Sequence, residues 1–237
     1  MRVFEYEVSK NGEVTITKYT GKAKRIVIPS EIKNLPVTKI ECEAFYEVDC
    51  ESIIIPDSVT EIDEYAFSDC TMKKVKLSSN LRIIGDFGFI DCCNLKSIVI
   101  PDSVTEMGWG VFERCEKLEK ITLPKNLNTI SEYMFNGCCN LESIVIPDSV
   151  TKIEECAFGE CSSLGYVVMS NNITRLGVEA FSGCNRLYGI TIPDTLTEIG
   201  TNVFINCSPT LKVNISEETR NRIIQMFMKG DILVSEY

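Results

Sequence analysis

A phenylalanine recurs along this chain at almost constant intervals of 22 or 23 residues. The copies are Phe45, Phe67, Phe89, Phe112, Phe135, Phe158, Phe181 and Phe204. A fixed period between about 20 and 50 residues is typical of solenoids, in which each unit buries its apolar face only against neighbouring copies. The period therefore predicts a repeat array rather than a globule.

Each unit begins with the pattern of a short strand. Ile121 and Leu123 alternate with polar residues, which is the period-two signature of a strand with one buried face. Nine positions fit this frame, from Arg25–Ile28 to Lys212–Ile215. We expect nine short strands, one per coil, stacked in parallel.

A bend follows each strand. Pro124 has no N–H and a fixed φ, so it ends the strand and turns the chain, and other coils have Pro or Ser at this position. The spacing from Leu127 to Ile130 suits a second short extended stretch. A helical or 3₁₀ turn is then expected to place Phe135 in the core, because 23 residues leave no room for two full elements.

The complete unit, C-x-x-L-x-x-I-x-I-P-x-x-[VL]-x-x-I-x-x-x-[AV]-F-x-x, resembles that of the BspA-like, or Treponema-type, leucine-rich repeat family over residues 24 to 215. The opening segments Ile28–Ile32 and Pro36–Ile40 also resemble that family, with about five extra residues in the first coil. The resemblance implies an α/β repeat fold, a right-handed leucine-rich-repeat solenoid with a parallel strand stack. It also implies surface or secreted ligand binders, some adhesive, in bacteria and parasitic protists.

Both ends of the array are expected to be capped. Residues Phe4–Tyr19 alternate apolar and polar around Asn11-Gly12, which predicts a β-hairpin with a type I′ turn. Ser216 is a candidate N-cap for a helix with Glu217 and Glu218 in its first turn. The helix should cover the last coil with Ile223, Ile224 and Phe227 and stop at Gly230, and Ile232–Val234 should add a short strand. We expect one continuous domain: a hairpin cap over 1–23, about eight coils over 24–215 and a cap helix over 216–237.

The composition argues against two classes of partner. The chain has a net charge of −10, a pI of about 4.7 and no evident cluster of Lys and Arg with interleaved aromatics, so nucleic acid is not expected. Apolar runs such as Ile53–Ile55 are only strand-sized, so membrane insertion is not expected. Glu5 and Glu7 stand where a signal peptide would be apolar. An intracellular protein and a fragment without its leader both remain open, and the localisation is unknown.

Seven of the twelve cysteines follow the repeating Phe by three residues. They are Cys70, Cys92, Cys115, Cys138, Cys161, Cys184 and Cys207. A position that recurs once per coil forms a column, and we interpret it as reduced core thiols; a disulfide framework is the alternative. Cys42, Cys93, Cys139 and Cys156 fall outside the column, could be exposed and would favour a reducing compartment. No metal site is expected, because a solenoid spreads thiolates apart.

Catalysis is not expected either. The chain contains no His, so the Ser-His-Asp and Cys-His catalytic arrangements are excluded. No glycine-rich phosphate loop is present either. Asp63–Glu64 and Glu154–Glu155 are interpreted as solvated turns rather than acid–base pairs. The sequence therefore predicts no catalytic residue and no cofactor.

A second period covers two coils. Asp follows the corner position at Asp57, Asp102, Asp148 and Asp194, and Lys125 stands between two of them. Carboxylates stacked at about 4.8 Å would repel each other, so alternation is favourable. A turn-forming role and a weak cation or ligand strip are both open.

The outward side of the strands is the candidate binding surface. We name Val99, Lys120, Thr122, Val145, Tyr166 and Val168 as candidate binding residues. An apolar stripe on a solvent-facing side marks an interaction surface, although β-branched residues also suit strands intrinsically. Tyr166 is the best single anchor, because interfaces favour an aromatic with a polar tip.

These observations predict a non-catalytic protein-binding module. Adhesion or ligand recognition at a microbial cell surface is the first hypothesis, and an intracellular protein-interaction scaffold is the alternative. The expected partner is a protein, for example a host matrix or surface protein, or a glycan, and the protein itself is expected to be a monomer.

Overall fold

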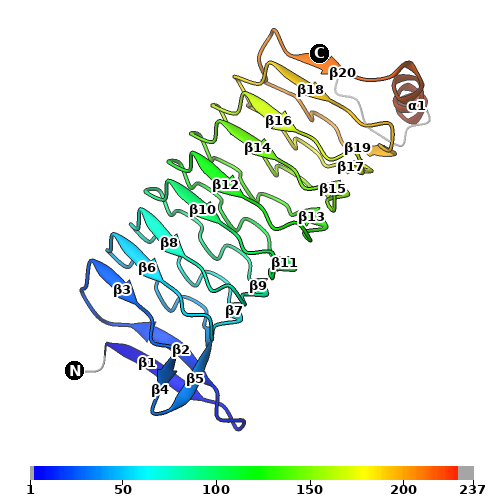
Figure 1. Cartoon of the computed structure of the whole chain (residues 1–237). Coiled ribbons are helices and arrows are strands. Elements are labelled where there is room, and N and C mark those ends of the chain that lie inside the picture. The colour runs from blue at the N-terminus through cyan, green and yellow to red at the C-terminus, as the bar shows by residue number, and fades with distance from the viewer. Residues whose placement is uncertain (1–2, 229–237) are drawn as a thin grey trace.

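A computed structural model describes residues 3–228 and shows an elongated solenoid of short strands (Figure 1). Nine three-residue strands, here called the long strands, lie along one side. They are β3 (Arg25–Val27), β6 (Ser52–Ile54), β8 (Lys74–Lys76), β10 (Ser97–Val99), β12 (Lys120–Thr122), β14 (Ser143–Val145), β16 (Tyr166–Val168), β18 (Gly189–Thr191) and β20 (Lys212–Asn214). The expected nine strand positions are confirmed.

A second row of strands follows the corner of each coil, as the spacing predicted. Apart from β5 (Leu35–Ile40), these short strands have two residues each. They are β7 (Glu61–Ile62), β9 (Ile83–Ile84), β11 (Glu106–Met107), β13 (Thr129–Ile130), β15 (Lys152–Ile153), β17 (Arg175–Leu176) and β19 (Glu198–Ile199). Neighbouring strands in both rows pair in parallel, except at one interruption in each row that is described below.

The repeating phenylalanines form one continuous stack in the core. The rings from Phe45 to Phe181 have no exposed surface, and successive ring centroids lie 4.9 to 5.8 Å apart with nearly parallel planes. Phe204, in the last coil, is partly buried. Because each ring contacts the ring before and after it, every coil depends on its neighbours, as expected for a solenoid.

The segment around each Phe differs from the expected helical or 3₁₀ turn. The residues two before and two after the Phe have positive φ, as Tyr65 (53°) and Asp69 (58°) do around Phe67. The amides of Tyr65, Phe67 and Asp69 all donate to carbonyls of the next coil. Left-handed residues interrupt a helix but turn these amides along the solenoid axis. Helical structure in the described residues is therefore confined to the C-terminal α1, and the repeats themselves are built from strands and turns.

The N-terminal hairpin is present, with a different turn. β1 (Phe4–Val8) and β2 (Val14–Tyr19) pair antiparallel, and the Tyr19 ring stacks on Phe45 at 5.4 Å. The Gly12 amide donates to the Ser9 carbonyl, and Gly12 but not Asn11 has positive φ. The loop is thus a turn over Lys10-Asn11 followed by a Gly bulge, and the expected type I′ turn at Asn11-Gly12 is wrong.

A type I′ turn occurs instead in the longer first coil. β4 (Glu31–Ile32) pairs antiparallel with β5, and the two residues between them, Lys33 and Asn34, have φ of 55° and 62°. Positive φ at both central positions defines this turn. The extra residues of the first coil therefore form a second small hairpin.

The C-terminal helix α1 (Glu217–Met228) begins at the expected cap. The Thr219 amide donates to Ser216 Oγ at 3.2 Å, and the acidic first turn is present. Ile223 packs against the core, but Ile224 is 46% exposed, so its expected place in the buried face is wrong. The buried face of the helix instead includes Thr219, which lies one turn before Ile223 and has no exposed surface. The Phe227 side chain, Gly230 and Ile232–Val234 lie outside what the structure describes.

Strand pairing is interrupted once along each row. In the described residues, β11 does not pair with β13, and β12 does not pair with β14. β12 pairs only with the preceding long strand, β10, and β13 pairs only with the following short strand, β15. Both interruptions therefore lie in the same coil, on either side of the corner between residues 122 and 129. The turn segments remain bonded across this seam, as Phe112 N–H to Met134 O shows.

Candidate functional site

The outward side of the long strands, here called the long-strand face, presents a row of exposed side chains. Parallel register places Val99 beside Thr122 and Val145 beside Val168, so equivalent positions form columns along the solenoid. Exposed fractions are 66% for Val99, 64% for Val145, 65% for Tyr166 and 39% for Val168. Lys120 and Thr122 are also exposed. All six candidate binding residues thus lie at the surface on one face; their role in binding is a proposal, taken up below.

A second tyrosine lies in the same region and was not among the candidates. Tyr188, just before β18, is 64% exposed. A Cβ added to Gly165 in the preceding coil would lie 3.7 Å from Tyr188 Cε2, an ordinary van der Waals distance, so the ring lies beside this glycine. Tyr166 pairs in register with Gly189. The signal was available in the sequence, because each tyrosine is matched by a glycine one coil away.

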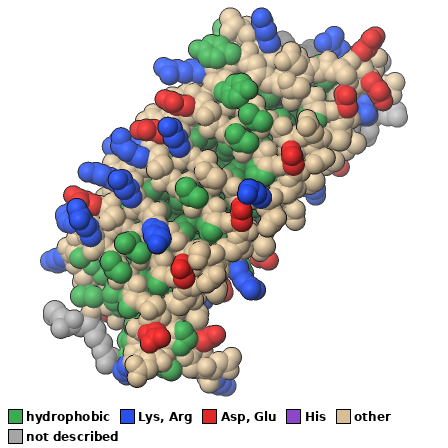
Figure 2. All heavy atoms as spheres, in the orientation of Figure 1, with side chains coloured by type: hydrophobic (Ala, Val, Ile, Leu, Met, Phe, Trp, Pro, Cys, Tyr) green, Lys and Arg blue, Asp and Glu red, His purple; other side chains and the backbone are tan. Residues whose placement is uncertain are grey.

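The half of the long-strand face that runs from β3 to β12 is basic, although the whole chain is acidic. Figure 2 shows Lys and Arg side chains gathered along the left-hand margin beside the long strands, with few acidic side chains among them. From β3 to β12, residues in or directly before these strands include Lys24, Arg25, Lys73, Lys74, Lys76, Lys96 and Lys120, against the acidic Glu51 and Glu119. No aromatic residue occupies these strand positions, so the cluster differs from the type with interleaved aromatics that the sequence was expected to lack; its members are separated by whole coils.

A hollow of about 430 Å³ opens in the basic part of the face, between β8 and β10. Its lining includes Lys74, Lys76 and Val99. These strands are paired through Ser97 and Lys74 alone, so they separate beyond that pair and expose the groove between them. This hollow combines cationic and aliphatic groups on one surface.

Away from the long-strand face, several acidic residues of the short strands and turns form ion pairs with cations. Arg175 bridges Glu154 and Glu198, and Lys39 bridges Glu61 and Asp63. Carboxylates held in this way stabilise neighbouring coils. They offer no paired acid and base aimed at a common point, as general acid–base chemistry requires.

The cysteine column is part of the core. Each Sγ donates to the carbonyl of the Phe in the preceding coil, as in Cys115 to Phe89 and Cys138 to Phe112, both at 3.2 Å. Cys70 through Cys184 are buried and Cys207 is half-buried, so the expected core column is confirmed. Burial raises the pKa of thiols such as Cys92 and Cys138 well above the ordinary 9.0. These thiols are small donors that satisfy buried carbonyls.

The remaining cysteines are unpaired as well. Cys42, Cys93, Cys139 and Cys156 are half-buried rather than exposed, and Cys50, which lies outside the column, is buried with its pKa raised by burial to about 11. Within residues 3–228, no group of three or more Cys, Asp and Glu side chains converges as a metal site would require.

The corner aspartates form turns. Asp57 accepts from the Ser79 amide at 2.8 Å and Asp102 from the Lys125 amide at 3.0 Å, and these bonds lower both pKa values. The Lys125 ammonium also lies 3.5 Å from Asp102. Asp57 and Asp102 thus link their corners to the backbone of the next coil, and Asp194 accepts from the Ser216 and Thr219 hydroxyls, so these three aspartates have structural roles at the corners.

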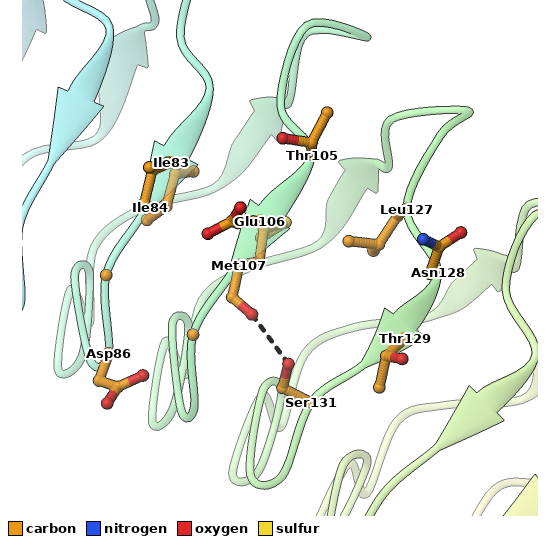
Figure 3. A pocket seen from close by; sticks show the side chains of 12 residues that line it. Ile83, Ile84, Asp86, Thr105, Glu106, Met107, Leu127, Asn128, Thr129 and Ser131 are labelled. Carbon is orange, nitrogen blue, oxygen red and sulfur yellow. Dashed lines mark hydrogen bonds between the residues drawn. The ribbon is translucent and has the colours of Figure 1, made fainter.

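A second hollow of about 430 Å³ lies at the seam, over the short strands β9, β11 and β13 (Figure 3). Ser131 Oγ donates to the Met107 carbonyl at 2.8 Å across the gap. Asp86 and Glu106 are the charged residues of the lining, and no cation accompanies them there. The hollow is a consequence of the interrupted pairing and brings no reactive pair together.

The repeat unit matches one known family over most of the chain. A model of the BspA type leucine rich repeat region matches residues 38–165 and 155–233, with six copies. This chain belongs to the BspA-type leucine-rich repeat family. The solenoid coils, the stacked Phe and the buried thiols described above therefore belong to a chain of this family.

Solved structures of leucine-rich repeat proteins resemble this BspA-type chain. A T. pallidum leucine rich repeat protein is 33% identical, with 82% of this chain and 90% of that one covered and a TM-score of 0.74. A leucine-rich repeat protein from Bacteroides ovatus is 27% identical, with 92% and 67% covered and a TM-score of 0.63. No curated protein matches the chain.

The family and the fold agree on the broad class of function. Leucine-rich repeat proteins are generally non-catalytic, and their extended surfaces are consistent with protein-interaction modules. Across residues 3–228, no helix is both long and apolar enough to cross a bilayer.

Proposed function

We propose that this BspA-type protein is a non-catalytic binding module that recognises its partner through the long-strand face. The observation that supports this is the row of exposed apolar side chains, in which Val99, Val145 and Tyr166 are each about two-thirds exposed. Exposed apolar side chains that are contiguous and rimmed by polar groups mark interaction surfaces in soluble proteins. A surface of paired strands is also rigid, so little conformational entropy is lost on binding.

Each candidate residue has a distinct role in this proposal. Val99, Val145 and Val168 supply apolar contact area, and Tyr166 supplies an aromatic anchor with a hydrogen-bonding tip. Lys120 and Thr122 form part of the polar rim. Tyr188 extends the aromatic end of the surface, because it projects over Gly165 in the neighbouring coil.

We place this activity in adhesion or ligand recognition at a microbial cell surface, with a host matrix protein, another surface protein or a glycan as the partner. The BspA-like resemblance supports this role, and the protein is expected to act as a monomer. An intracellular interaction scaffold is the second candidate. Twelve free cysteines favour it, because reduced thiols persist in the cytosol.

The test is a binding screen followed by paired variants. Wild-type protein is applied to arrays of matrix proteins, surface proteins and glycans, and affinities of the positives are measured by surface plasmon resonance. Tyr166→Lys combined with Val168→Lys should weaken binding at least about thirtyfold, the loss expected at a hot spot. Glu155→Lys on the turn side serves as the control and should change affinity little.

The circular dichroism spectra and unfolding midpoints of all variants should match wild type, because the three side chains are exposed. Binding lost in Glu155→Lys but kept in the tyrosine–valine variant would place the site on the turn side and contradict the proposal.

A further inference from the structure

The basic half of the long-strand face has a regular arrangement. The first position of successive long strands is occupied by Arg25, Ser52, Lys74, Ser97 and Lys120. Register pairs Arg25 with Ser52, Ser52 with Lys74, Lys74 with Ser97 and Ser97 with Lys120, so these residues form one column. Cations therefore alternate with serines, one cation in every second coil.

The spacing of these cations follows from the sheet. Parallel strands lie about 4.8 Å apart, so alternate coils place successive cations roughly 9.6 Å apart along the solenoid axis. A polyproline II chain rises about 3.1 Å per residue with three residues per turn, so its residues i and i+3 share one side at about 9.3 Å. The spacing of the cations along the solenoid therefore nearly equals the spacing of residues i and i+3 in a polyproline II chain.

The cations of this column are available to a partner. Within the part of the chain that the structure describes, Arg25, Lys74 and Lys120 form no ion pair, and neither do the adjacent Lys73 and Lys76. Lys24 and Lys96, in contrast, pair with Asp49 and Glu119. All five unpaired cations are exposed, so a bound carboxylate would meet them without displacing an internal partner.

Apolar groups accompany these charges. Val27, Ile54 and Val99 are 62%, 41% and 66% exposed in the column two residues farther along the strands. The hollow between β8 and β10 joins Lys74 and Lys76 to Val99. A ligand that fits this half is anionic along the edge that faces Arg25, Lys74 and Lys120 and mainly apolar along the other edge, where Lys76 stands between Ile54 and Val99.

We infer that the partner segment is an acidic polypeptide in an extended, polyproline II-like conformation, with Asp or Glu at every third residue facing Arg25, Lys74 and Lys120 and with apolar residues facing Val27, Ile54 and Val99. This inference rests on the proposed function of the long-strand face and specifies the chemistry of the partner. Charge complementarity supports it, because opposite charges across an interface select the partner and set its register.

A single-stranded nucleic acid is the main competing anion. Such binding combines basic grooves with aromatic platforms on which bases stack. Every outward residue of β3 to β12 is aliphatic, polar or basic, and the exposed tyrosines of the long-strand face, Tyr166 and Tyr188, lie in or next to β16 and β18, outside this half. The polypeptide is therefore the better fit.

Fluorescence anisotropy with labelled 12-residue peptides tests the inference. The probes are four repeats of Glu-Pro-Val, the same peptide with Gln for Glu, and an isomer with its four Glu adjacent. The Glu-Pro-Val peptide should bind at least about tenfold more tightly than the Gln peptide and about threefold more tightly than the isomer, and higher salt should weaken it. A 12-nucleotide single strand is measured alongside.

Matched charge reversals locate the site. Lys74→Glu with Lys120→Glu should reduce affinity for the Glu-Pro-Val peptide about tenfold or more. Lys10→Glu with Lys152→Glu changes the net charge equally at exposed residues of the hairpin and of β15, and should change affinity less than about threefold.

Several results would overturn the inference: equal binding of the Glu and Gln peptides, equal losses in both charge-reversal variants, or tighter binding of the oligonucleotide. Self-association of the wild type, abolished by Lys74→Glu with Lys120→Glu in sedimentation equilibrium, would identify a second copy as the occupant instead. If array partners depend on Tyr166 and Val168 but not on Lys74 and Lys120, this inference fails while the proposed function stands. If they depend on neither pair, both fail.

Discussion

Individual residues in the core of this solenoid are coupled to their equivalents in neighbouring coils. Phe135 lies between Phe112 and Phe158, with ring centroids 5.8 and 5.2 Å away, and Cys138 donates to the Phe112 carbonyl. A single substitution therefore disturbs three coils. Side chains on the long-strand face have no such coupling, because they project into solvent.

Replacing Phe135 with Ala should lower the free energy of unfolding by about 3–5 kcal/mol, because it removes a fully buried ring and leaves a cavity in the middle of the stack. Urea unfolding should show a lower midpoint. Val145→Ala, at a 64% exposed position, serves as the control and should leave the midpoint nearly unchanged. A Phe135→Ala midpoint equal to wild type would remove this ring from the core.

The thiols of the cysteine column should be protected from alkylation in the native protein. Cys70 through Cys184 of this column are buried, and burial raises the pKa of Cys92 and Cys138, so little nucleophilic thiolate forms; half-buried Cys207 is the exception to this prediction. Mass spectrometry should find these cysteines unmodified by iodoacetamide under native conditions. All twelve cysteines should react after denaturation without reductant; disulfide-linked peptides would contradict the interpretation of reduced core thiols.

At the scale of elements, strand positions were predictable from the sequence, whereas turn geometry was not. Alternation around Ile121 and the corner Pro124 identify a strand from side-chain type alone. Positive φ at Tyr65 and Asp69 could not be predicted, because glycine occupies few of the equivalent positions. Hydrogen bonds from these amides to the next coil stabilise positive φ, although residues other than glycine intrinsically prefer negative φ.

The seam should be the weakest junction between coils. Ser131 Oγ to Met107 O is a hydrogen bond that spans it where strand pairing is absent. Ser131→Ala should reduce stability by about 1 kcal/mol and accelerate amide exchange in β11 and β13. Ser97→Ala, on the exposed side of β10, is the control. Exchange rates in β11 and β13 that do not respond to Ser131→Ala would show that the turn segments alone hold the junction.

At the scale of the whole molecule, charge is divided between two sides. The repeat period already places Lys74, Ser97 and Lys120 in one column of the long-strand face, but the net charge of −10 conceals that this half of the face is basic. The apolar candidates were found because they occupy the same position of every repeat. Periodicity thus predicts which side chains share a column, and the structure shows which of them are exposed and which form ion pairs.

Stability of the whole array should fall at alkaline pH. Burial raises the folded pKa of Cys70, Cys92, Cys138 and Cys161 above 9.0, while unfolded thiols ionise near that value. The stabilisation is fully present below pH 9 and is lost as pH rises from there toward the folded pKa values, by about 1.4 kcal/mol per thiol and pH unit. Urea midpoints at pH 8 and 10 measure this loss. A variant with Cys92→Ala and Cys138→Ala should lose less between the two values; an equal loss would assign the effect to other groups.

The central claim, that the long-strand face is the binding surface, is tested most directly by methyl NMR of protein labelled at Val and Ile. The tightest partner from the arrays is titrated into the labelled protein. Methyl resonances of Val99, Val145 and Val168 should shift or broaden first, while those of Val178 and Ile224, which are exposed outside this face, should remain unchanged. Shifts confined to Val178 and Ile224, with the long-strand valines unaffected, would contradict the account.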